Sequence, residues 1–361
     1  MTAARATFSI SQASWRWWVM LFALVGASLY AYRTRERAGP TVARFGGPAQ
    51  GSTYSVVLNG GRPDSVVSSL KSAVDSLLAD VDAQMSTYDS ASELSRLNRD
   101  TANTPVVLSA PLAEVMRQSI AVSQASGGAF DVTVGPLVDA WGFGPAGVLT
   151  RVPDSTMLDA LRARVGWQKL RLEGESLTKG HPHLEIDLSA IAQGYTVDLI
   201  SALLSARGEA NHFVEVGGEV RARGRNAQGM PFRVGIEQPD VDRRSVRLVV
   251  GLADRALATS GNYRDFHDVD GVRYVHTIDP ATGKPVRHRL LAASVLHQQC
   301  SLADAWATAL MVVGPERAWA MAEANRLEVL LLVAGPNGEV QERMTAGFRA
   351  AVIRDGEPKR H

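Results

Sequence analysis

Two oxygen-bearing side chains near the end of the chain have the spacing of a cation site. Asp304 and Thr308 stand four residues apart inside an apolar run, Leu302 to Val313, which predicts a helix. Residues four apart share one face of a helix, so the carboxylate and the hydroxyl are expected to point the same way. Hard cations such as Mg²⁺ bind oxygen ligands of this kind, usually together with phosphates. A bare pair is more often a solvated Asp beside a Thr at the edge of a core, so other segments must support the site.

The composition narrows the class of protein. The 361 residues are 45% hydrophobic and 21% charged, an ordinary globular balance that suffices for one large domain or two lobes. The net charge is +1 and there is no long basic run, so nucleic acid is not expected as a partner. Cys300 is the single cysteine, which excludes an intrachain disulfide and a zinc site built on cysteines.

The first 37 residues differ from the rest of the chain. Sixteen uncharged residues, Trp17 to Tyr32, lie between Arg16 and a basic group at Arg33, Arg35 and Arg37. This pattern predicts a signal sequence or a short membrane anchor over residues 1–37, since sixteen residues is near the lower limit for a spanning helix. No cysteine follows the apolar run, which excludes a lipid-modified N-terminus. We favour an uncleaved anchor with the body of the protein exported.

The remaining sequence predicts the elements that position the chemical groups. Residues 38–48, which contain several Gly and Pro, are interpreted as a linker, residues 49–352 as the folded body and residues 353–361 as a polar tail. Periodic apolar residues predict helices at Ser65 to Met85, Pro111 to Ala125, a segment from Pro153 capped by Asp154 or Ser155, Ile191 to Leu204, and Pro315 to Asn325. Short apolar runs predict strands at Tyr54 to Leu58, Leu184 to Leu188, His212 to Val216, Phe232 to Ile236, Val246 to Val250, Tyr274 to Ile278 and Val329 to Val333. Strict alternation is absent, so we expect an α+β fold rather than a doubly wound sheet.

Two segments in the first half of the body could contact a ligand. Tyr88 follows a predicted helix, with Ser92 to Asn98 beyond it, and could stack on a flat ligand or belong to an ordinary core. In Gly128 to Pro136, continued by Trp141 to Gly144, glycines and a proline surround an Asp. Such a segment favours a rigid turn where backbone can approach a ligand, although alone it is more often a structural loop.

A third segment, Ile186 to Tyr195, runs from a predicted strand into a predicted helix. The free N–H groups at the helix start, near Ser189, favour anions such as pyrophosphate. Asp187 or Ser189 could equally act only as a helix cap. In a fourth segment, the diglycine before Glu219 is interpreted as a simple turn after a strand.

A fifth segment places a histidine at the end of a predicted strand. His276 lies close to Asp279 and to a Pro-Gly turn, and Thr259 to Tyr263 precedes it in the chain. A His there could move a proton near neutral pH, although a lone His is more often structural. The helix of Asp304 and Thr308 is the sixth segment.

Together and in this order, the six segments resemble the ApbE-type flavin transferases, which transfer FMN from FAD to proteins. The resemblance runs from about Gln50 to Gly314, and its most specific parts are FDVTVGPLVDAWGFG, HTIDPATGKP and ADAWATAL. It implies an ApbE-like, T-fold-like body with an FAD cleft and a Mg²⁺ ion at the pyrophosphate. The implied metal contacts are Asp304, Thr308, the carbonyl of Ala190, and Ala307. The implied flavin-nucleotide contacts are Gln50, Tyr88, Ala129, Phe130, Asp131, Asp187, Gln193 and Ile278.

The chain departs from the usual family pattern at three of these places. Gln50 stands where Met is frequent, and Gln193 stands where Lys is frequent, which removes a cation that could sit near phosphate. Glu219 follows the two glycines where Asp is frequent. None of these changes removes a predicted metal ligand.

The resemblance implies a reaction in which a Thr or Ser hydroxyl of a target protein attacks the FMN-side phosphorus of FAD. AMP leaves, and the target keeps FMN through a phosphoester bond; such transfer depends mainly on positioning and charge neutralisation. His276 is the candidate proton acceptor, with Asp279 and Asp187 as rivals. Three alternatives remain: hydrolysis of FAD to FMN and AMP, a flavin-binding protein without chemistry, and a purely structural exported domain.

The resemblance also implies the partners and the location. The targets would be exported or membrane-bound redox proteins whose acceptor Thr lies in a short motif rich in Asp, Ser, Thr and Gly. With the predicted anchor, the protein is expected at a bacterial inner membrane with its body on the periplasmic side.

Overall fold

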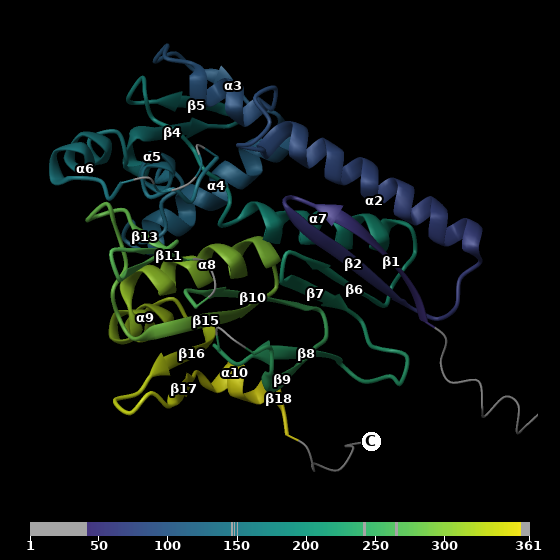
Figure 1. Cartoon of the computed structure of the whole chain (residues 1–361). Helices are drawn as coiled ribbons and strands as arrows, with labels where there is room; N and C mark the ends of the chain where they lie inside the picture. The colour runs from purple at the N-terminus through teal and green to yellow at the C-terminus, as the bar shows by residue number, and fades with distance from the viewer. Residues whose placement is uncertain are drawn as a thin grey trace, which may run out of the picture.

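The structure is a computed structural model that describes residues 42–145, 147, 149, 151–240, 243–263 and 266–354 (Figure 1). The predicted anchor at residues 1–37 and the first part of the predicted linker lie outside the described residues. Among the described residues, no helix has both the length and the apolar character needed to cross a membrane. The fold is a mixed α+β fold built around one large antiparallel sheet, as the sequence predicts in its coarse form.

Eight strands form the main sheet, and every neighbouring pair in it is antiparallel. In spatial order they are β1 (Val42–Ala49), β2 (Ser52–Asn59), β6 (His212–Val216), β7 (Glu219–Arg223), β10 (Arg255–Gly261), β15 (Leu290–His297), β16 (Glu328–Ala334) and β17 (Val340–Met344). Segments that are far apart in the sequence therefore become neighbours, because β2 pairs with β6 and β7 pairs with β10.

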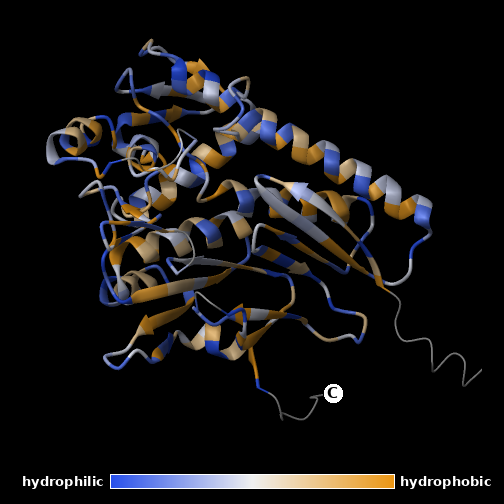
Figure 2. Cartoon of the chain, viewed as in Figure 1, coloured by the Kyte–Doolittle hydropathy of each residue, from blue (hydrophilic) through white to orange (hydrophobic). Residues whose placement is uncertain are grey.

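Both faces of the central strands are covered. Along β16, Val329 and Leu331 belong to the core on the helical face, whereas Leu330 and Leu332 belong to the core on the opposite face. Successive side chains of a strand point to opposite faces, so a strand buried on both sides is a continuous apolar run. Figure 2 shows this run as a hydrophobic β16, in contrast to the mixed colouring of α2 (Asp64–Met85).

Helices cover one face of the sheet in two tiers (Figure 1). α7 (Ala192–Ala206) and α8 (Cys300–Val313) pack side by side on the strands, and α2 packs on α7. α4 (Ala110–Ala125) and α9 (Pro315–Ala324) pack on α8. The opposite face is covered by β8 (Phe232–Glu237), β9 (Val246–Leu252), β18 (Val352–Ile353) and α10 (Ala346–Ala351).

The remaining small sheets, hairpins and short helices lie together beside α8, and we call this group the cap (Figure 1). A three-stranded sheet contains β3 (Val106–Val107), β5 (Ser176–Lys179) and β4 (Leu170–Glu173). The short helices are α3 (Glu93–Arg99), α5 (Gly135–Ala140), α6 (Ser155–Arg162) and the 3-10 helix η1 (Trp167–Lys169). Two hairpins complete it: β11 (Phe266–Val269) with β12 (Val272–Val275), and β13 (Ile278–Asp279) with β14 (Lys284–Pro285).

Most predicted elements are confirmed within a few residues, and the exceptions have physical reasons. The interpretation of residues 42–48 as linker is wrong, because they form the edge strand β1, where Gly46 lets Tyr54 approach: an added Cβ would lie 2.5 Å from the Tyr54 carbonyl oxygen. The strand predicted at Leu184 to Leu188 is wrong, because this segment belongs to no sheet and the Asn98 amide instead bonds to both Ile186 backbone groups at 2.8 Å. The predicted strand at Tyr274 to Ile278 is interrupted at His276, between β12 and β13. Ile353, assigned to the tail, belongs to β18.

Candidate functional site

The predicted face of α8 lines the larger of two neighbouring cavities, which we call the main cavity. It has a volume of about 680 Å³, and Asp304 and Thr308 both reach it. Asp304 is 8% exposed, and Thr308 is half-buried. Ala307 is 1% exposed and packs in the hydrophobic core instead. Successive helix residues are about 100° apart, so Ala307 cannot share the direction of Thr308.

The packing of α7 against α8 fixes the Asp304 carboxylate. At Gly194 the helices are so close that an added Cβ would lie 2.5 Å from the Cys300 carbonyl oxygen. The Gly194 N–H donates to Asp304 Oδ2 at 3.2 Å. In a continuous helix this N–H would bond to the carbonyl of Ala190, four residues earlier. That carbonyl is therefore available to a ligand, and Ala190 lines the main cavity.

Asp198 of α7 holds the first turn of α8 in place. Its carboxylate accepts hydrogen bonds from the backbone N–H groups of Cys300 and Ser301, both at 3.0 Å, and pairs with Arg221. The first N–H groups of a helix have no partner within the helix, so this carboxylate caps α8 from a neighbouring helix. No local pattern in the sequence indicates this cap, because its partners are about a hundred residues apart.

Two buried carboxylates, those of Asp304 and Glu219, line the main cavity and repel each other when both are charged. Burial raises the pKa of Asp304 to about 7. Burial, and then the negative charges of Asp304 and Glu215, raise the pKa of Glu219 well above its ordinary value. Glu219 is 7% exposed, lines the main cavity, and its Oε2 has no hydrogen-bond partner among the described residues.

These groups fit a hard divalent cation. The donors are oxygens of a carboxylate, a hydroxyl and a backbone carbonyl, which Mg²⁺ prefers. A buried carboxylate with an unpartnered oxygen is costly unless a positive charge compensates it. Within the described residues no group of three or more His, Cys, Asp and Glu side chains could hold a metal, so a cation here would need the mixed oxygen donors just named.

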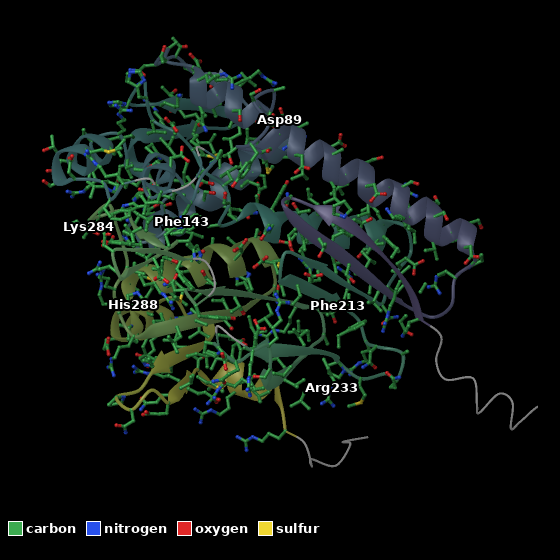
Figure 3. The ribbon with its side chains drawn as sticks, viewed as in Figure 1. Asp89, Phe143, Phe213, Arg233, Lys284 and His288 are labelled. Atoms are coloured by element: carbon green, nitrogen blue, oxygen red, sulfur yellow. The ribbon has the colours of Figure 1, made fainter. Side chains whose placement is uncertain are left out.

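The entrance of the main cavity is aromatic. Tyr88 is 75% exposed, which excludes the alternative of an ordinary core residue. On the other side, the Phe143 ring stacks on His267 with centroids 4.3 Å apart and meets His276 edge-on at 6.3 Å. Figure 3 shows Phe143 between the cap and α8. All four side chains line the main cavity, and His276 is the one that the sequence predicts as a proton acceptor.

The loop of Ala129, Phe130 and Asp131 lines the main cavity, but the Asp131 side chain is already bonded within the protein. Its Oδ1 accepts from the N–H and the hydroxyl of Thr133, and its Oδ2 accepts from the Trp167 N–H at 2.9 Å. Burial raises the pKa of Asp131, and these bonds oppose the shift. The Asp131 side chain therefore stabilises the loop that lines the main cavity.

Asp187, Gln193 and Ile278 also line the main cavity. The Asp187 Oδ1 accepts from the N–H and the hydroxyl of Ser189, at 2.8 and 2.6 Å, which shapes the turn before α7. The Gln193 amide packs against Gly217, where an added Cβ would lie 2.6 Å from it. The two glycines after Glu215 thus let β7 start close to α7.

Besides Ala307, two predicted site residues do not line the main cavity. Gln50 lies in the turn between β1 and β2, where its Nε2 donates to Thr196 Oγ1 at 2.9 Å. Asp279 is bonded within its own hairpin: its carboxylate accepts from the Ala281 N–H at 2.9 Å and the Thr282 hydroxyl at 3.0 Å. Asp279 is therefore a turn residue in this structure, and it is removed from the candidate proton acceptors.

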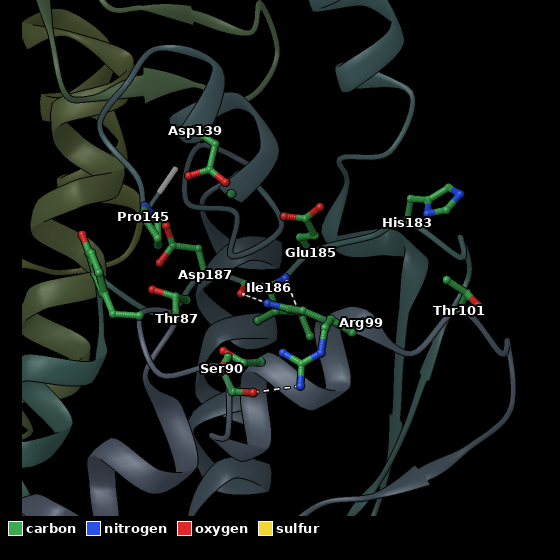
Figure 4. A pocket seen from close by; sticks show the side chains of 14 residues that line it. Thr87, Ser90, Arg99, Thr101, Asp139, Pro145, His183, Glu185, Ile186 and Asp187 are labelled. Carbon is green, nitrogen blue, oxygen red and sulfur yellow. Dashed lines mark hydrogen bonds between the residues drawn. The ribbon is translucent and has the colours of Figure 1, made fainter. Parts of the chain in front are cut away.

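A side cavity of about 430 Å³ adjoins the main cavity (Figure 4). The two share Thr87, Tyr88, Pro145 and Asp187. Asp139, Glu185 and Asp187 surround it, and Arg99 donates to the Ser90 carbonyl at 2.8 Å. Burial, and then the Asp139 charge, raise the pKa of Glu185. Of these acidic residues the sequence singled out Asp187 as a candidate site residue, but not Asp139 or Glu185.

Comparisons with known proteins show which family the chain is similar to. The model of the ApbE family matches residues 50–331. A FAD:protein FMN transferase of Vibrio cholerae is 45% identical over 305 residues, which are 84% of this chain and 90% of that protein. One of Haemophilus influenzae is 38% identical over 312 residues, again 84% and 90%. Among solved structures, the flavin transferase ApbE from Vibrio cholerae has a TM-score of 0.80 at 42% identity, with 86% of this chain and 99% of that chain covered. The flavinyl transferase ApbE of Pseudomonas stutzeri, in its apo form, has a TM-score of 0.78 at 37% identity, covering 86% and 97%.

Proposed function

Because the chain belongs to the ApbE family and is a flavin transferase with FAD as its donor, we propose that it joins FMN to a Thr or Ser hydroxyl of an acceptor protein through a phosphoester bond. The supporting observation is the main cavity, which brings together Asp304 and Thr308 from α8, His276 from the link between β12 and β13, and Tyr88 from the loop after α2. These groups come from three separate segments of the chain, and each has a part in the transfer.

FAD binds along the main cavity in this proposal. Tyr88 is exposed at the entrance, where its ring can stack on a flat ring of the ligand. The backbone of residues 129–131 and the turn of Asp187 form the wall, with Gln193 beside them. Gln50 and Ala307 do not reach the cavity and are left out of the proposed binding set.

Asp304, Thr308 and the Ala190 carbonyl would hold a divalent cation, Mg²⁺ by its preference for such oxygen donors. When bound, this cation supplies charge neutralisation at the pyrophosphate and stabilises the departing AMP. The protein's own contribution is the orientation of the ligands: Gly194 donates to Asp304, and Asp198 fixes the start of the helix that carries Asp304 and Thr308.

The transfer proceeds by attack of the acceptor hydroxyl oxygen on the FMN-side phosphorus. The bond from that phosphorus to the bridging oxygen breaks, and AMP leaves with the bridging oxygen. The hydroxyl proton passes to His276, which faces the main cavity beside Phe143. Asp187, the remaining rival, already accepts two hydrogen bonds from Ser189 on one carboxylate oxygen, which disfavours it as the base.

The acceptor and the location follow from the proposed chemistry. Residues 1–37 would anchor the protein at a bacterial inner membrane, with the cleft on the periplasmic side, where exported redox proteins with the acceptor motif would be modified. Fractionation of cells that express the full chain tests this placement. Protease added to spheroplasts should digest the body; complete protection would contradict it.

The reaction is tested by incubating the full chain with FAD, MgCl₂ and a purified redox protein that carries a Thr in an Asp-, Ser-, Thr- and Gly-rich motif. We expect the acceptor to gain the mass of one FMN through a phosphoester, with equimolar AMP. Acceptor with this Thr replaced by Val is the control. Release of FMN and AMP without any modified acceptor would instead support FAD hydrolysis.

A further inference from the structure

Glu219 lines the main cavity, and the proposed reaction assigns it no role. It is the first residue of β7, directly after Gly217 and Gly218, whose φ angles are 65° and 113°. Positive φ at both positions is readily adopted only by glycine. The diglycine turn therefore brings the start of β7 under α7, and the Glu219 side chain enters the main cavity with Asp304.

The Glu219 side chain lacks a partner that would explain its burial. It is 7% exposed, and its Oε2 makes no hydrogen bond with any residue that the structure describes. The charges that act on it, from Asp304 and Glu215, are both negative. Because an uncompensated buried carboxylate is unfavourable, the site is complete only when something positive lies next to that oxygen.

We propose that Glu219 Oε2 is a ligand of the same divalent cation that Asp304 and Thr308 hold. This inference rests on the cation site of the proposed function. It adds a second carboxylate to that site, so that two negative side chains balance the charge of the cation before any phosphate arrives. The site then binds the cation in the absence of FAD, and the loaded site receives the pyrophosphate.

The position of Glu219 distinguishes this role from a general effect of negative charge. Glu215 lies in the same hairpin and carries the same charge, but its Oε1 accepts from the Gly218 N–H at 3.1 Å and it does not line the main cavity. Glu215 thus has a structural partner for the oxygen nearest the turn, whereas Glu219 Oε2 has none among the described residues. Replacing each by Gln removes one charge with almost no change in shape.

The test is a titration of the full chain with Mn²⁺ in the absence of FAD, with free Mn²⁺ measured by electron paramagnetic resonance. Loss of a group that supports a metal site costs about 10–100-fold in affinity. We expect Glu219→Gln to raise the Mn²⁺ Kd by about that factor, Glu219→Asp to recover part of the loss, and Glu215→Gln to change it less than about threefold. Thermal unfolding in EDTA shows whether each variant is folded.

The outcomes distinguish a failure of the Glu219 inference from a failure of the cation site itself. If Asp304→Asn weakens Mn²⁺ binding and Glu219→Gln does not, the inference about Glu219 is overturned while the cation site stands. If neither variant changes Mn²⁺ binding, the cation site of the proposed function fails as well. If Glu219→Gln binds Mn²⁺ normally but loses flavin transfer, Glu219 acts on the acceptor hydroxyl and is not a cation ligand.

Discussion

The two ends of the main cavity are built in different ways. We call Ala190, Gln193, Glu219, Asp304 and Thr308 the floor, and Tyr88, Phe143, His267 and His276 the rim. The floor lies on a helix pair and a strand start, and its carboxylates are buried. The rim lies mainly on loops and short hairpins, and its side chains are half-buried or exposed. We infer that the floor is preorganised for a fixed phosphate group, whereas the rim can admit two large substrates in turn.

The floor should be the more sensitive end, and Asp304→Ala is the strongest test of this. The variant loses the carboxylate that faces the proposed cation, so we expect the rate of FMN transfer to fall about 10³-fold or more, since charge neutralisation at phosphate is worth several kcal/mol. The rate is measured as fluorescent flavin bound covalently to the acceptor. Labelling at the wild-type rate would remove Asp304 from the site.

At the rim, His276→Gln should reduce the turnover about 10²-fold, the usual contribution of a general base. FAD affinity should change little, because the ring meets Phe143 at its edge and lies at the entrance. Single-turnover labelling at saturating FAD measures the chemical step. A variant with normal turnover and weaker FAD binding would make His276 a binding residue.

The third test asks whether the floor depends on a carboxylate outside the cavity. Asp198→Ala removes the cap of α8 and leaves Arg221 without its partner. We expect unfolding in urea to show a stability loss of about 2–4 kcal/mol, together with weaker Mn²⁺ binding. Asp159→Ala, which breaks an exposed pair with Arg162, is the control. Equal losses in the two variants would show that Asp198 adds nothing beyond a surface ion pair.

Tyr88 tests the rim as a stacking surface with a smaller effect. Tyr88→Ala should weaken FAD binding about 3–10-fold, the range of an aromatic pair, and should leave the stability unchanged because the side chain is exposed. Tyr88→Phe keeps the ring and should bind FAD as the wild type does. Quenching of flavin fluorescence measures both. Identical affinities for Ala and Phe would exclude stacking.

The smallest expected effect concerns His212, which supports α7 at the end away from the floor. Its Nε2 is 2.8 Å from Ser201 Oγ, its Nδ1 is 2.7 Å from the Glu209 carbonyl oxygen, and burial lowers its pKa. A lowered folded-state pKa means that the unfolded chain binds the proton first as pH falls below about 6.5, so the contribution of His212 to stability is present above that pH and declines below it.

Comparison of His212→Gln with the wild type isolates this contribution from other titrating groups. The stability difference between the two proteins should shrink by at most about 1.4 kcal/mol per pH unit as the pH is lowered below about 6.5. Urea unfolding at pH 7.5 and 5.5, with EDTA present, provides the measurement. A difference that is independent of pH would contradict a lowered pKa at His212.

The sequence determined the groups whose relation is local. The spacing of Asp304 and Thr308 is enough to place them on one face of a helix, because the helical period fixes the faces of residues four apart. The Pro and Gly residues after His276 were enough to predict the turn at residues 280–283, although the strand predicted at Tyr274 to Ile278 is interrupted at His276. The apolar run at Val329 to Val333 was enough to predict a buried strand, and the structure shows that β16 is buried on both faces.

Only the tertiary structure decided the relations between distant residues. The cap of α8 by Asp198, the contact of Gly194 with Cys300 and the burial of Glu219 beside Asp304 each join segments more than 80 residues apart. Such contacts leave no periodic pattern, because they depend on how the helices and strands pack. For the same reason the sequence assigned Glu219 to a simple turn, although its side chain lies in the main cavity.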